Sequence, residues 1–107
     1  MIITKRHHTE ETEMIKTFAA LKKDALNASS TVELFRIAKA SNDKLRSNVA
    51  KAQMMSYTHG RAAEADHYFQ NVIPAWQAIN NEIHAMLRKA MEGKSAEEVV
   101  EIIKEAA

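Results

Sequence analysis

Few positions in this chain force a helix to end, because its 107 residues include only two glycines and one proline. Gly60 and Gly93 are expected at the ends of helices, and Pro74 is the single residue without a backbone N–H to donate. Alanine, glutamate, lysine and methionine are plentiful elsewhere, and all four favour helices. The sequence therefore predicts an all-α fold, a bundle of three to four helices in one domain spanning residues 1–107.

Apolar residues recur in steps of three and four over four segments, which is the period of a helix with one buried face. The predicted helices cover about residues 10–27, from 31 to 57 or 58, and 61–92, and a short fourth helix begins at the Ser95 capping box and includes Ala106. The second and third helices are the long amphipathic ones. Residues 1–8 show no helical period and are expected to form a flexible tail.

The helix boundaries follow from capping and helix-breaking residues. Ser30 and Ser95 are each followed three residues later by a glutamate, which is the pattern of a capping box. Gly60 is predicted as a left-handed C-cap; the alternative is one very long helix that tolerates this glycine. The second helix is predicted to be continuous, with a break at Ser41 as the alternative. The apolar pattern keeps its phase across Pro74, so a kink is expected there and not a chain reversal.

The composition excludes several classes of function. Without cysteine, the chain has no disulfide, no thiolate metal site and no cysteine nucleophile. The formal net charge of +1 points to no particular partner. The first residues lack the apolar run of a signal peptide, and no apolar stretch has the length of a membrane span. A cytoplasmic protein that does not bind membranes is therefore expected.

No local pattern in the sequence is typical of catalysis. The two glycines are too far apart for a phosphate-binding loop, and the serines and histidines form no nucleophile signature. Glu64 and His67 have the Glu-x-x-His spacing of di-iron bundles, but such a site needs a second copy of the motif. The pair also falls opposite the apolar stripe of its own helix. We therefore expect no metal, no cofactor and no enzymatic activity.

The third helix carries more apolar surface than its neighbours obviously cover. At 1.5 Å per residue its roughly 30 residues extend about 45 Å, whereas the first and fourth helices are much shorter. We therefore expect a homo-oligomer built on the second and third helices, with a lone four-helix bundle as the alternative. The predicted interface residues are Phe69, Val72, Trp76, Ile79 and Ile83.

The second helix carries five basic residues against one acid, Asp43, between positions 34 and 60. On a helical wheel the five lie opposite the apolar stripe; they are Arg36, Lys39, Lys44, Arg46 and Lys51. A basic face of this kind can contact phosphates. A phosphate- or nucleic-acid-binding regulator is therefore the alternative function, and an ordinary solvated face would show the same pattern.

Two smaller features complete the interpretation. Met54 and Met55, beside Tyr57, are interpreted as core filling near a turn, with an adaptable contact surface as the alternative. The acidic fourth helix is interpreted as a solvated cap over the bundle end, or as a partner for the basic helix of a neighbouring copy. The sequence thus favours a small non-enzymatic accessory protein that contacts itself and another protein, by analogy with inhibitors and regulators from phages and plasmids.

Overall fold

The computed structural model describes residues 16–107, which form helices and turns and contain no strand. The described part of the first helix covers residues 16–26. The elements that follow are α2 (Thr31–Tyr57), α3 (Ala62–His67), the π-helical turn η1 (Tyr68–Val72), α4 (Ile73–Met91) and α5 (Ala96–Ala106). The predicted all-α helical bundle is confirmed. The predicted tail, residues 1–8, and the start of the first helix lie outside the described residues.

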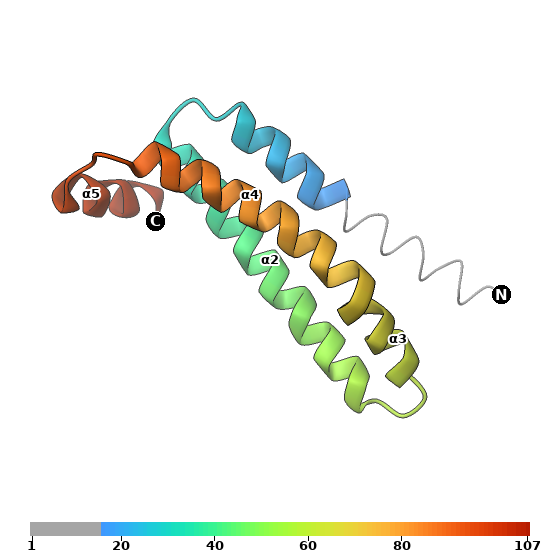
Figure 1. Cartoon of the computed structure of the whole chain (residues 1–107). Coiled ribbons are helices and arrows are strands. Elements are labelled where there is room, and N and C mark those ends of the chain that lie inside the picture. Colours follow the sequence, from blue (N-terminus) through green and yellow to red (C-terminus); the bar gives the residue numbers. More distant parts are fainter. Residues whose placement is uncertain (1–15) are drawn as a thin grey trace.

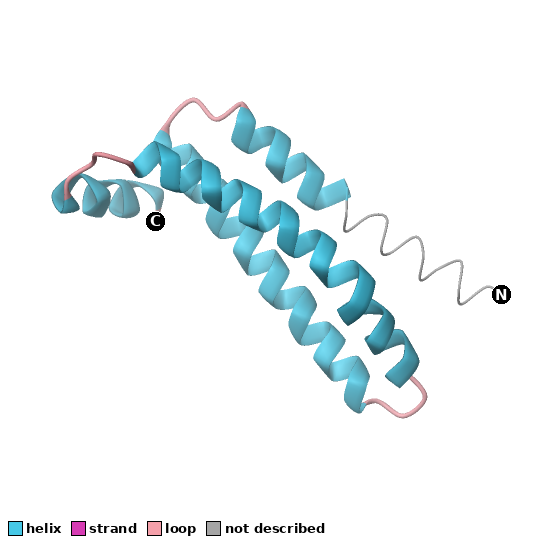
Figure 2. Cartoon of the chain, viewed as in Figure 1, coloured by secondary structure: helices cyan, strands magenta, loops and turns pink. Residues whose placement is uncertain are grey.

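The long helices lie side by side as an elongated body (Figure 1). α2 runs in one direction, and α3, η1 and α4 return along it as one nearly continuous rod. The helix of residues 16–26 lies along α4, while α5 turns away from the end of the bundle and packs on α2. Figure 2 shows that short loops make the connections. The described residues measure 53 × 25 × 20 Å, so one end of the molecule is far from the other.

The core consists of two apolar clusters placed one after the other along the bundle. The first contains Phe18, Leu45, Ala52, Tyr68, Val72, Ile73 and Trp76. The second contains Ala25, Leu34, Ala38 and Ile83. In the first cluster the rings of Phe18 and Trp76 are stacked with centroids 5.8 Å apart, and Tyr68 meets Trp76 edge to face. Aromatic pairs of this geometry add to the stability gained from apolar burial.

A buried polar pair lies between the two clusters. On α2, Ser41 lies between the residues of the second cluster and those of the first. Asn80 has the same intermediate position on α4. The Ser41 hydroxyl is fully buried and donates a 2.8 Å hydrogen bond to Asn80 Oδ1. α2 runs through Ser41 without a break, so the alternative of two shorter helices is wrong. The serine points into the bundle and satisfies an amide there, which explains a polar residue on the buried face.

The two predicted capping boxes differ in the structure. At Ser95 both halves are present: its hydroxyl accepts from the Glu98 amide, and the Glu98 carboxylate accepts from the Ser95 amide. At Ser30 the hydroxyl accepts from the Glu33 amide, but the Glu33 carboxylate accepts from the amide and hydroxyl of Ser29. The second half of that predicted box is therefore wrong by one residue. The Ser29 side chain first, and its backbone second, lower the pKa of Glu33.

Gly60 and Pro74 interrupt the helical pattern where the sequence predicts, but the C-cap of α2 is Thr58 and not Gly60. Gly60 has φ 82 in the turn after α2, so one uninterrupted helix is excluded. The long return helix does not reverse at Pro74. Instead, the chain widens into η1 immediately before it, where the Ile73 amide donates to the Tyr68 carbonyl five residues back. Because proline has no N–H, an α-helical bond is lost at this point, and a π-helical turn is one of the recognised ways to absorb that loss.

Candidate interaction surfaces

The predicted interface residues lie mainly in the chain's own core. Val72, Trp76 and Ile83 are buried, and Ile79 is half-buried against both clusters. Phe69 alone among the five is exposed, at 38%. The reason is that α2 and the helix of residues 16–26 cover the return helix from two sides (Figure 1). The expectation that this helix has surplus apolar surface was therefore wrong, and the stripe itself does not offer an interface.

Arg36, the first of the predicted basic residues, is engaged within the chain. Its Nη2 donates to the Glu105 carbonyl at 2.7 Å and its Nε to the Ala106 carbonyl at 3.3 Å. These carbonyls belong to the last turn of α5, where a helix has acceptors without intrahelical partners and a partial negative charge. Arg36 therefore fixes the C-terminal end of α5 to the first half of α2.

The other four predicted cations are exposed on α2 and form two rows. Lys44 and Lys51 are seven residues apart, as are Lys39 and Arg46, and a seven-residue step returns to almost the same side of a helix. Between the rows, the C-terminal half of α2 presents the small residues Ser47 and Ala50 and then Met54. We call these last three residues the α2 strip.

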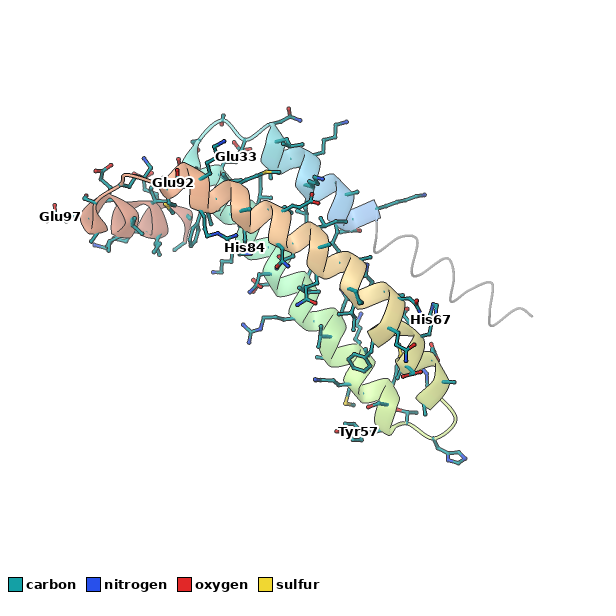
Figure 3. All side chains as sticks on the ribbon, in the orientation of Figure 1. Glu33, Tyr57, His67, His84, Glu92 and Glu97 are labelled. Carbon is teal, nitrogen blue, oxygen red and sulfur yellow. The ribbon has the colours of Figure 1, made fainter. Side chains whose placement is uncertain are left out.

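A shallow groove follows the α2 strip to the turn beyond it. The groove is lined by Ser47, Ala50, Lys51, Met54, Met55, Thr58 and Arg61. Met54 is 70% exposed, whereas Met55 packs partly against the first core cluster. Tyr57 is 88% exposed and points away from the bundle (Figure 3). The interpretation of Met54 as core filling is thus wrong, and the exposed end of α2 combines apolar and basic side chains.

The second surface is α5, a strongly amphipathic helix none of whose side chains is buried. Val99 and Ile102 are half-buried, while Val100 is 46% and Ile103 45% exposed. Ala96, Val100 and Ile103 share one side of the helix, and we call them the α5 strip. The acids on this helix are Glu97, Glu98, Glu101 and Glu105, against Lys104 alone among basic residues. Glu97 and Glu101 line a shallow depression together with Ala96 and Val100.

The Glu64 and His67 pattern does not build a metal site. Glu64 accepts two hydrogen bonds from the Arg61 guanidinium, at 2.8 and 2.9 Å. His67 is exposed, with Nδ1 3.2 Å from the Asn71 side-chain amide. Within residues 16–107 no three histidine or carboxylate side chains are grouped as metal ligands would be. Nor does any helix in that range combine the length and apolar character required to cross a membrane.

Comparisons with known proteins add no further assignment. The chain matches no protein-family model, and neither curated proteins nor solved structures give a significant match. The two exposed surfaces, the C-terminal half of α2 and the helix α5, lie toward opposite ends of the bundle.

Proposed function

We propose that this chain is a non-enzymatic, cytoplasmic interaction protein that binds a protein partner through α5. The observation that carries the proposal is a capped, amphipathic helix whose apolar strip, Val100 and Ile103 above all, is left in water. Covering such surface contributes about 25 cal/mol per Å² before the entropic costs of association are subtracted. An amphipathic helix laid in an apolar groove is a recurrent mode of protein recognition.

The length of α5 supports the same proposal. Its 11 residues are too few for a stable isolated helix, since helices shorter than about 12–15 residues are marginal in water. The capping box at Ser95 and the Arg36 contacts hold it in shape without burying its side chains. The helix is thus preformed for a partner, which reduces the ordering cost of binding.

Site-specific photocrosslinking in cells tests this role of α5. A photoreactive residue replaces Val100 in one variant and Leu26 in a matched control, since Leu26 is an exposed apolar residue, at 66%, on the helix of residues 16–26. Discrete adducts are expected from position 100 and not from position 26. A further variant carries the photoreactive residue in place of Ile103. If neither position 100 nor position 103 yields an adduct, α5 is not a protein-binding surface. The adduct mass also identifies the class of partner.

A second candidate function is phosphate or nucleic-acid contact by α2, because Lys39, Lys44, Arg46 and Lys51 are all exposed on it. The engagement of Arg36 by α5 removes one cation from the predicted set. If α2 contacts phosphates, binding of labelled nucleic acid should weaken steeply as salt is added. A plot of log K against log salt concentration should have a slope of about −0.9 for each phosphate contacted.

Charge reversal separates this candidate from nonspecific attraction. Lys44→Glu with Arg46→Glu should reduce both the affinity for nucleic acid and the salt slope, the latter by about 2. Lys23→Glu with Lys89→Glu is the matched control, because both lysines are exposed on other helices. Equal binding by both double variants would reject α2 as the site.

A further inference from the structure

We propose that copies of this chain associate head to tail, with α5 of one copy seated along the α2 strip of the next. This inference rests on the proposed function of α5 and names its partner. The two surfaces are complementary in charge and in apolar character, and each copy presents both of them. A second copy is therefore a partner that the chain itself specifies.

The charge pattern supports this pairing. α5 has four acids and one base, whereas the half of α2 from Asp43 onward has Lys44, Arg46 and Lys51 against that single acid. Glu97 and Glu101 outnumber Lys104 on the border of the α5 strip, and Lys44 and Lys51 border the α2 strip. Opposite charges beside the two strips both attract the helices and fix their register.

The shapes of the two strips are also compatible. Ser47 and Ala50 are small, so a helix can approach α2 closely at that point. Met54, at the end of the strip, is exposed, and its flexible, polarizable side chain adapts to irregular apolar surfaces. Val100 and Ile103 on α5 supply the branched apolar side chains that would fill this surface.

A chain cannot place its own α5 on its own α2 strip. Arg36 holds the last turn of α5, and Met54 lies 18 residues further along α2, or about 27 Å at 1.5 Å per residue. The 11 residues of α5 extend only about 16 Å. Its first turn, with Glu97, points away from the bundle, and Tyr57 marks the opposite end (Figure 3). The contact must therefore form between copies.

Contact between two different surfaces is heterologous, and this determines how the assembly grows. Such contacts form rings when the rotation closes and open chains when it does not, in contrast to a closed two-fold dimer. A standard interface buries about 1,200–2,000 Å², and one short helix in a shallow groove buries less. We therefore expect weak association, in the micromolar range or above, that increases with concentration and decreases with salt.

Sedimentation velocity over about two decades of concentration, centred on ~50 μM, tests the proposal on the full chain. The wild-type mass is expected to rise above the 12.0 kDa of one chain without stopping at two copies. Glu97→Lys with Glu101→Lys should weaken association at least about tenfold, and Lys44→Glu with Lys51→Glu should do the same. Lys23→Glu with Lys89→Glu is again the matched control and should have no comparable effect.

Mixing the two interface variants gives the decisive measurement. In the mixture, the charge-reversed α5 of one variant can bind the charge-reversed α2 strip of the other. The unchanged α5 and α2 strip of the two variants can also bind each other. The mixture should therefore associate at concentrations where each variant alone does not. Circular dichroism checks that both variants remain helical. A wild-type chain that stays monomeric throughout, or a mixture no larger than its components, overturns the head-to-tail contact.

The crosslinking experiment distinguishes failure of this inference from failure of the proposed function. Adducts from position 100 whose mass is a multiple of the single chain support self-association. Adducts of other masses alone overturn it but leave α5 as a protein-binding helix. Complete absence of adducts from α5 contradicts both.

Discussion

The buried hydrogen bond between Ser41 and Asn80 provides a quantitative test of how the bundle is stabilised. Ser41→Ala removes the donor and leaves Asn80 Oδ1 without it, in a residue that is only 6% exposed. An unsatisfied buried polar atom costs about 1–3 kcal/mol. Alanine gains about 0.5 kcal/mol in helix propensity over serine. The net expected loss in the free energy of unfolding is therefore about 0.5–2.5 kcal/mol.

Removing both polar groups should have the opposite outcome. In Ser41→Ala with Asn80→Leu no polar atom of the pair remains buried, and leucine has the same branched outline as asparagine with bulkier methyl ends. Such joint replacements by apolar groups of similar shape are nearly neutral or stabilising. The added leucine would also join the two core clusters, which Ser41 and Asn80 now separate. The double variant is expected to be at least as stable as the wild type.

Urea and thermal unfolding followed by circular dichroism measure both effects. A loss of 1 kcal/mol lowers the Tm of a domain of this size by about 4–8 °C, so the Tm of Ser41→Ala should be lower by about 2–20 °C. Ser47→Ala is the matched control, because it makes the same substitution at an exposed site on the same helix. If the two serine variants are equally stable, or if the double variant loses as much as Ser41→Ala, the pair does not act as a satisfied buried hydrogen bond.

Three further predictions concern the core, a cap and acid stability. Ile83→Ala should lose about 2–5 kcal/mol in urea unfolding, because Ile83 is fully buried, whereas Leu26→Ala at an exposed site should lose less than about 0.5 kcal/mol. Gly93→Ala should lower the free energy of unfolding by about 1 kcal/mol. The cause is backbone strain and not a steric clash, since φ is +78 and no atom lies within 4 Å of an added Cβ. The lowered pKa of Glu33 means that its stabilising contribution is present above its ordinary value of 4.5 and is lost as pH falls through the folded pKa. Glu33→Gln should therefore flatten the acid side of a plot of Tm against pH, and an unchanged profile would contradict that role.

Local signals predicted the helix ends well. The last residue of α2, the position of Gly93 beyond α4 and the capping box at Ser95 all agree with the structure. These features depend on residues within one turn of each other, so the sequence contains all the information needed. The error in the predicted partner of the Glu33 carboxylate also arises within one turn. Two consecutive serines offer it equivalent donors, and the choice depends on the exact path of the turn.

The form of the distortion at Pro74 was less predictable. A proline in a helix removes one hydrogen bond, but a kink, a π-helical turn and a rotated neighbouring helix all accommodate that loss. Here Tyr68 and Val72, at either end of η1, are both buried in the first core cluster. The wider turn keeps both side chains in the core on the two sides of the interruption. Packing, which a helical wheel does not contain, therefore determined which form was adopted.

The interface residues show the limit of periodicity most clearly. A helical wheel identifies which face of a helix is apolar but not which neighbour covers it. The stripe through Trp76 is covered because Phe18 reaches it from a helix distant in sequence. The stripe through Val100 is half-uncovered because α5 turns away from the bundle. The two helices have the same kind of apolar pattern, but one apolar face is buried and the other is exposed. The surface available to a partner is therefore identified only after the segment that packs on each apolar face is known. On that criterion α5, whose 11 residues cannot reach the exposed end of their own α2, is the part of this bundle that a partner would complete.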